Sequence, residues 1–357
     1  SIIGPTYPFR GGISHYTTLL SKELSKEHVV NLISFKKLYS KVLVKLFYKA
    51  DLNFKDKESK EIIKFDAKDI IDTTNPLTWF SAFFEIKKQK PDILIFHWQT
   101  PYFSLVYFTI MVLTRLFTKT KILLICHNVL PHEARFIDMI LSKSVFSKVD
   151  YFIVHSKDDL KKLEKLKKNA NFRLGFHPIY SMFNIKKFDK EKIRRELKLK
   201  NNVILFFGFV REYKGLRYLI RALPEVLRKI DLDLLIVGEF WEKKKYLDLI
   251  QNLNLQKNIK LVDKYVPNEE VGKYFSVADI VVLPYESATQ SGIVQIAYGF
   301  DKPVITTDVG GLKESIFNNK TGFVIKPKDS NALSQSIIEF YSQKKSKEFI
   351  KNIKKEK

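Results

Sequence analysis

The sequence predicts an α/β protein with two Rossmann-like domains, each built on a parallel sheet. Short, continuous apolar segments alternate with helical stretches along the whole chain, and such runs are typical of strands covered on both faces. A length of 357 residues fits two domains better than one core. A hydrophobic fraction of 45% with 28% charged residues indicates a folded globular protein rather than a disordered one.

The predicted strands fall in both halves of the chain. After an opening strand that ends at Gly4, they lie at 29–33, 93–96, 122–125 and 151–154, and then at 203–207, 234–237, 259–262, 280–283, 304–306 and 323–325. We expect an N-terminal domain over 1–180, a connection without strand pattern over 181–200, a C-terminal domain over 201–336 and a helical tail over 337–357. The lysine-rich tail could dock on the first domain or remain solvated.

The net charge is high enough to attract polyanions. It is +23, from 62 Lys and Arg against 39 Asp and Glu. The lysines are scattered over helix faces and no nucleic-acid-binding signature accompanies them, so an anionic membrane surface is a better candidate partner than nucleic acid. A genome that favours Lys codons would explain the charge equally well.

Cysteine content and hydropathy bear on the location. Cys126 is the only cysteine, which rules out an internal disulfide or a cysteine zinc site and predicts a reducing, cytoplasmic compartment. The longest apolar run, residues 102–117, is interrupted by polar side chains and is shorter than the ~20 residues that span a bilayer. We expect a buried helix there, with an in-plane membrane contact, peripheral at the inner face, as the alternative.

The segment FFGFVREYKG is the most informative for chemistry. A buried strand runs into Gly208 and is followed by Arg211 and Lys214 before a helix begins near Leu216. Ligands of doubly wound domains bind at the carboxyl ends of strands, and two cations there suit a diphosphate. The alternative is an ordinary basic surface turn.

A second strand end, in LPYESATQSGIVQ, offers an anion site. Ser291 can cap the helix that follows, and Gly292 lets backbone amides approach a phosphate. Glu286 could accept hydrogen bonds from a ribose, although an exposed loop carboxylate is the commoner outcome.

Two constellations stand in the first half. The loop GPTYPFRGGIS places Gly11 and Gly12 before a helix but lacks the GxGxxG spacing of a dinucleotide site. In ICHNVLPHE a strand ends before His127 and Asn128, whose side chains can hydrogen-bond sugar hydroxyls, and His97 follows another strand. The spacing of the histidines in HNVLPHE does not suit a metal site.

In this order the segments resemble the retaining glycosyltransferases of family four, which have the GT-B fold of two Rossmann-like domains with a nucleotide-sugar in the cleft. The resemblance is carried by PFRGGISHYT, HNVLPHE, FFGFVREYKGL, IVGEFW, YVPNEEVGKYFSVADIVVLPY, SATQSG and KPVITTDVGGLKE.

The resemblance implies a role for each matching residue. His127 would contact the transferred sugar, and Arg211 with Lys214 would bind the diphosphate. Gly11 and Gly12 would lie beneath the diphosphate, and His97 and Asn128 would line the acceptor side. The amides that start at Gly292 would bind phosphate; the donor-binding segment as a whole comprises Gly208, Glu286, Thr289, Ser291, Gly292, Ile293, Val294 and Gln295. Neither a metal nor a cofactor is implied, because the cations replace the metal.

The chain departs from the family pattern at two glutamates. Thr289 stands in the first place, and the second falls around Gln295 to Ala297, so neither is a carboxylate. Gln295 could supply hydrogen bonds instead. The predicted function is a retaining hexosyltransferase that uses a nucleotide-sugar donor and a glycan or lipid-linked acceptor in cell-surface glycan or glycolipid synthesis. The alternative is a weakened nucleotide-sugar-binding or scaffold protein on the same fold.

Overall fold

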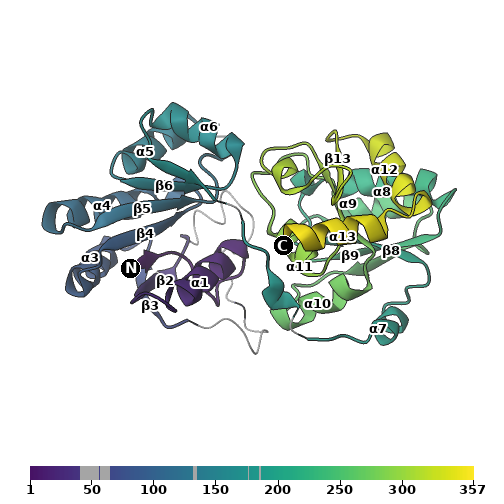
Figure 1. Cartoon of the computed structure of the whole chain (residues 1–357), viewed down its shortest axis with the longest axis horizontal. Coiled ribbons are helices and arrows are strands. Elements are labelled where there is room, and N and C mark those ends of the chain that lie inside the picture. Colours follow the sequence, from purple (N-terminus) through teal and green to yellow (C-terminus); the bar gives the residue numbers. More distant parts are fainter. Residues whose placement is uncertain (41–55, 57–64, 132–134, 176, 185) are drawn as a thin grey trace. The chain divides into compact units, whose positions relative to one another are not determined.

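The computed structural model describes residues 1–40, 56, 65–131, 135–175, 177–184 and 186–357, and they form two compact units (Figure 1). Unit 1 spans Ser1–Phe176 and unit 2 spans His177–Lys357. The predicted connection over 181–200 therefore lies in unit 2, where it contains the helix α7, Lys190–Glu196.

Unit 1 is built on a seven-stranded, all-parallel sheet with the order β3-β2-β1-β4-β5-β6-β7. Its strands are β1 (Ile2–Ile3), β2 (Leu32–Lys37), β3 (Ala67–Asp72), β4 (Ile93–Trp98), β5 (Lys121–Cys126), β6 (Tyr151–Val154) and β7 (Phe172–Leu174). Its helices are α1 (Gly12–Leu24), α3 (Pro76–Gln89), α4 (Ser104–Phe117), α5 (Phe136–Phe146) and α6 (Lys157–Leu166).

Unit 2 contains a six-stranded parallel sheet with the order β10-β9-β8-β11-β12-β13. Its strands are β8 (Asn202–Phe207), β9 (Leu232–Val237), β10 (Ile259–Val262), β11 (Ile280–Leu283), β12 (Val304–Thr307) and β13 (Gly322–Ile325). After α7 come α8 (Leu216–Leu227), α9 (Lys243–Asn252), α10 (Asn268–Val277), α11 (Gly292–Gly299), α12 (Ser330–Ser342) and α13 (Ser346–Glu356).

Burial explains why the central strands were predictable. All of β9 and β11 is buried, and β8 is buried from Val203 onward, because helices cover both faces of a doubly wound sheet. Side-chain caps fix several helix starts: Ser156 Oγ accepts the Asp159 amide, and Asp329 Oδ1 accepts the Ala332 amide. The predicted α/β class with two parallel sheets is confirmed.

Some elements differ from the sequence expectation. The strand expected at 29–33 begins at Leu32, and Val29 is 91% exposed. The edge strands β3 and β7 were not predicted. Within the predicted tail, Phe349 of α13 is fully buried in the core of unit 2 beside Phe323.

Most of the run at 102–117 forms α4, which is only partly the expected buried helix: its inner side chains are buried, whereas Leu105, Leu116 and Phe117 are exposed. Within the described part of the chain, no helix has both the length and the apolar character that crossing a membrane requires.

Candidate active site

The strand order of unit 2 reverses between β8 and β11. The chain moves from β8 to β9 and β10 on one side, and then returns to β11 on the other side of β8. Ligands of open parallel sheets bind where the strand order reverses, outside the carboxyl ends of the strands. The two segments that the sequence singled out, after Phe207 and after Leu283, both lie at this reversal.

Lys214 is a buried cation at the end of β8. It ends a short 3-10 helix, Glu212–Lys214, and is 8% exposed. Its ammonium lies 5.6 Å from the ring centroid of Tyr285, and among the described residues no carboxylate forms an ion pair with it. Burial, and then the positive charge of Arg211, lower the pKa of Lys214 from 10.5 to about 7. The site therefore holds a cation that lacks an anionic counterpart.

Arg211 is held by stacking. Its guanidinium lies 3.8 Å from the ring centroid of Trp241 and 5.8 Å from that of Phe209. Trp241 comes from the turn after β9, so two adjacent strand ends hold the arginine. A guanidinium held against an aromatic face is a common ligand of planar or bidentate anions.

The start of α11 lies beside Lys214. A Cβ built on Gly208 would be 3.1 Å from Lys214 Nζ and 3.6 Å from Ile293 Cδ1, so the β8 turn, the lysine and the first turn of α11 meet. Ser291 caps α11 by accepting the Ile293 amide at 3.3 Å, and its carbonyl accepts the Val294 amide at 3.2 Å. The positive end of the helix dipole thus faces the same place as the lysine.

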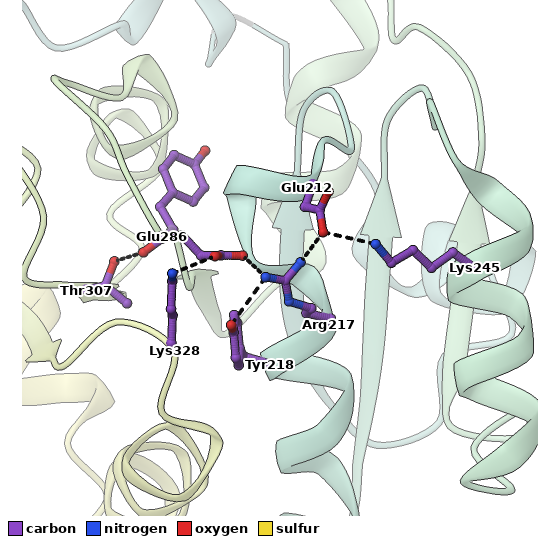
Figure 2. A network of polar contacts seen from close by, with 8 residues as sticks. Glu212, Arg217, Tyr218, Lys245, Glu286, Thr307 and Lys328 are labelled. Atoms are coloured by element: carbon purple, nitrogen blue, oxygen red, sulfur yellow. Dashed lines mark hydrogen bonds and ion pairs between the residues drawn. The ribbon is translucent and has the colours of Figure 1, made fainter. Parts of the chain in front are cut away.

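Glu286 is bound into an ion-pair network in unit 2 (Figure 2). One carboxylate oxygen lies 2.6 Å from Arg217 and the other lies 3.5 Å from Lys328. Arg217 also pairs with Glu212 at 2.6 Å, and Lys245 reaches Glu212 at 3.0 Å. These pairs occupy the Glu286 carboxylate, and they brace the loop after β11 against α8.

Close backbone contacts join the strand-end turns of unit 2. Gly215 has φ +65°, and a Cβ there would lie 1.9 Å from the Pro284 carbonyl oxygen. Gly310 has φ +47°, and a Cβ there would lie 1.9 Å from the Ala288 carbonyl oxygen. Only glycine fits such positions, so the turns after β8 and β12 both press on the loop after β11. The Gly311 amide also donates to Thr289 O at 2.9 Å.

Gln295 lies in the second turn of α11. Its side chain is buried at 7% exposure, and its carbonyl accepts the Tyr180 amide at 3.4 Å. Tyr180 Cε2 would lie 3.2 Å from a Cβ at Gly292. The segment 289–295 is therefore backed on one side by residue 180 and on another by the loop at 310–311.

A cluster of three histidines forms in unit 1. His97 lies within β4 rather than after the strand as predicted, His127 comes after β5 and His155 after β6. Tyr16 of α1 contacts all three rings edge-on. His97 Nδ1 and His127 Nε2 are 2.9 Å apart. Strand order reverses between β1 and β4, so this cluster lies at the reversal point of the unit 1 sheet.

Burial keeps the inner histidines neutral. Burial, and next the charge of His155, lower the pKa of His97 to about 3, and burial lowers the pKa of His155. A neutral His97 either donates to His127 or accepts from it, so the tautomers of the two rings are coupled. His97 is therefore placed to orient His127.

The other described residues of unit 1 that the sequence predicted for the site are Gly11, Gly12 and Asn128. Gly11 is the N-cap of α1 with φ +124°, and a Cβ at Gly11 or Gly12 would meet nothing within 4 Å. The backbone there is open to a ligand. Asn128 follows His127, whose amide donates to Trp98 O at 2.8 Å. His132 and Glu133 lie outside the described residues.

The structure brings together Gly208, Lys214 and Ile293 in unit 2, and His97 and His127 in unit 1. Sequence reasoning missed several partners of the predicted site residues: Tyr16 and His155 in unit 1, Trp241 beside Arg211, and Arg217 and Lys328 beside Glu286. The strand-end rule could have found His155 and Trp241, because each follows a predicted strand closely. Within the described ranges there is no group of three or more His, Cys, Asp or Glu side chains that could hold a metal ion.

The second half of the chain is similar in sequence to one protein family. Residues 188–356 match the family model described as glycosyl transferases group 1. An uncharacterized glycosyltransferase from Methanocaldococcus jannaschii is 30% identical over 184 residues, which is 50% of this chain and 46% of that protein. D-inositol 3-phosphate glycosyltransferase from Corynebacterium diphtheriae is 27% identical over 138 residues, or 37% of this chain and 32% of that protein. The matches span less than half the length of these relatives.

Solved structures match over nearly the whole chain. Sucrose-phosphate synthase from Thermosynechococcus elongatus has a TM-score of 0.74 at 17% identity, covering 99% of this chain and 92% of that one. HepE from Anabaena in complex with UDP has a TM-score of 0.73 at 16% identity, covering 99% and 93%. These likenesses show that the chain has the GT-B fold of two Rossmann-like domains.

Proposed function

We propose, from the match of residues 188–356 to group 1 glycosyltransferases, that the protein transfers a hexose-type sugar from a nucleoside diphosphate to an acceptor hydroxyl, with retention at the anomeric carbon. The observation that carries the proposal is the buried Lys214, which has no carboxylate partner among the described residues and lies beside Arg211 and the start of α11 at the strand reversal of unit 2. UDP-sugars are the first donors to test, because the fold neighbour HepE was solved with UDP.

Leaving-group stabilisation is the chemical basis of the proposal. As the bond between the anomeric carbon and the phosphate oxygen breaks, negative charge develops on the diphosphate. Lys214, Arg211 and the dipole of α11 would offset that charge. The acceptor oxygen would attack from the same face, and its proton would pass to the departing phosphate oxygen. No metal or cofactor is required in this scheme.

The proposal assigns supporting roles to other residues. Gly292 and the following residues would contact phosphate, and Gln295 would supply hydrogen bonds in place of a carboxylate. In unit 1, His127 would contact the transferred sugar, with its orientation set by His97. We propose a glycan or lipid-linked acceptor and a place of work at the inner face of an anionic membrane, because the chain carries +23 formal charges.

A test measures donor turnover and nucleotide binding separately. Thermal-shift screening with nucleoside diphosphates should identify the base, because a ligand at ~100 times its dissociation constant stabilises a fold by about 2.7 kcal/mol. Hydrolysis of the matching sugar donor should then fall at least about a hundredfold in Lys214→Ala, the usual cost of losing one transition-state contact. Exposed Lys229→Ala is the matched control. Unchanged turnover in Lys214→Ala would refute the assignment.

One observation favours a second function. Glu286 is ion-paired with Arg217 and Lys328. The two places where the resembled family pattern has glutamates, Thr289 and the stretch around Gln295 to Ala297, carry no carboxylate. A nucleotide-sugar-binding or scaffold protein with weakened catalysis would share these features. Nucleotide binding without turnover, across lipid and glycan acceptors, would identify that function.

A further inference from the structure

Unit 1 exposes apolar side chains on the outer surface of three neighbouring helices. In α3 the exposed side chains Leu77, Phe80 and Phe84 recur at three- and four-residue spacing and so form one stripe along the helix. The opposite side of α3, which includes Phe83 and Ile86, is buried in the unit. The helix is therefore apolar on the inside and on the outside.

The helices α4 and α5 repeat this pattern. In α4, Leu105, Leu116 and Phe117 are 66%, 70% and 57% exposed. In α5, Phe136 and Ile140 stand 75% and 45% exposed. The helix α4 packs against α3 on one side and against α5 on the other, so the three helices run side by side (Figure 1). We call the surface made by these side chains and those of α3 the apolar face.

Basic residues border the apolar face. The segments 76–90, 104–121 and 135–148 contain nine Lys or Arg residues against two acidic ones, Glu85 and Asp138. Lys87 Nζ lies 5.4 Å from the ring centroid of Phe117, and Lys148 Nζ lies 5.6 Å from that of Phe108. Long basic side chains beside apolar ones can reach lipid headgroups while the apolar groups enter the acyl boundary.

We infer that the apolar face of α3, α4 and α5 is the surface by which the protein binds a bilayer that contains anionic lipid. The charge excess decides between occupants. A two-fold contact with a second copy would bring Lys87 and Lys88 against the same basic surface of the partner, which is repulsive. An anionic bilayer satisfies the apolar and the basic side chains together. The inference deepens the membrane part of the proposed function and is independent of sugar transfer.

Vesicle flotation of the full chain tests this surface. Phosphatidylcholine vesicles containing phosphatidylglycerol should bind the protein, and vesicles of phosphatidylcholine alone should bind it weakly. The double variant Phe84→Ser/Leu116→Ser should bind about tenfold more weakly or worse, because two apolar groups no longer enter the interface. Leu247→Ser/Phe317→Ser removes two exposed apolar side chains of unit 2 and should leave binding unchanged.

The charge contribution is tested with a matched pair of variants. Lys87→Glu/Lys88→Glu should weaken binding to anionic vesicles and flatten its salt dependence, whereas Lys351→Glu/Lys355→Glu on α13 makes the same change in net charge and should have a smaller effect. Binding that both apolar double variants retain equally would overturn the inference. A dimer in sedimentation velocity that Phe84→Ser/Leu116→Ser dissolves, without vesicle binding, would assign the face to a second copy instead.

Donor hydrolysis in solution separates this inference from the proposed function. Phe84→Ser/Leu116→Ser should hydrolyse a soluble donor at the wild-type rate, and Lys214→Ala should float with vesicles as the wild type does. Failure of vesicle binding with intact, Lys214-dependent turnover would refute the docking surface alone. Intact docking with turnover that ignores Lys214 would refute only the transfer chemistry.

Discussion

Replacement of Lys214 by Met separates what the residue does for chemistry from what it costs the fold. The ammonium is buried beside Arg211, and methionine keeps a long, unbranched side chain without the charge. We expect Lys214→Met to abolish donor turnover and to stabilise the fold. Such opposite effects are expected where a binding site holds unpaired charge before its ligand arrives.

The expected gain follows from the pKa of Lys214. A change from 10.5 to about 7 corresponds to about 5 kcal/mol between the charged and neutral forms. Local relaxation and loss of the contact with Tyr285 offset part of it, so we expect unfolding free energy to rise by about 1–3 kcal/mol near neutral pH. Because the folded pKa lies below the unfolded one, the unfolded wild type binds more protons between these values, and its stability rises with pH in that window.

Urea unfolding of the wild type, Lys214→Met and the exposed control Lys229→Met measures this effect. The advantage of Lys214→Met should be largest below about pH 7 and should shrink toward about pH 10, and Lys229→Met should stay within about 0.5 kcal/mol of the wild type. Lys302, whose pKa burial also lowers to about 8, is present in all three proteins and cancels in the difference. A variant that is less stable than the wild type, or whose advantage does not change with pH, would refute the reasoning.

Substitutions at three further positions test the two sites. Gly215→Ala places a Cβ against the Pro284 carbonyl at positive φ, so the free energy of unfolding in urea should fall by about 2 kcal/mol or more. Nucleoside diphosphates should also raise the melting temperature of this variant less than that of the wild type. A variant as stable as the wild type would contradict the close contact. Ser291→Ala removes the cap of α11 and should cost about 1 kcal/mol, whereas Ser291→Asp should keep the cap but oppose phosphate binding in calorimetry. His97→Phe removes the partner of His127 Nε2 and should lower donor turnover about tenfold, more than His97→Asn does. Because the pKa of His97 is about 3, neither variant should remove a titration between about pH 5 and 8 from the pH profile of the rate.

The central strands were predictable because strands that are buried on both faces consist of continuous runs of apolar residues. The strands at 151–154, 259–262 and 280–283 have the predicted ends. The edge strand β3, with the sequence AKDIID, has only Ile71 fully buried, so its apolar signal is weak. The apolar pair at 29–30 led to a predicted strand start three residues before β2 begins at Leu32, although Val29 points into solvent.

The site was predictable only where chemistry follows a strand end directly. Gly208, Lys214 and Ser291 stand within a few residues of β8 or α11, and their places follow from the sheet. The pairing of Glu286 with Lys328 joins positions far apart in the chain, and no local pattern reports it. The stacking of Arg211 on Trp241 also depends on two separate strand ends meeting.

The contacts of Gly215 with Pro284 and of Gly310 with Ala288 limit how unit 2 can be re-engineered. A turn that touches its neighbour through bare backbone cannot be exchanged alone, since a donor sequence with a slightly different path would collide with the adjoining turn. Grafts that aim to change donor preference should therefore transplant residues 208–215, 284–292 and 308–312 as one block. Chimaeras that swap a single one of these turns should express as misfolded protein.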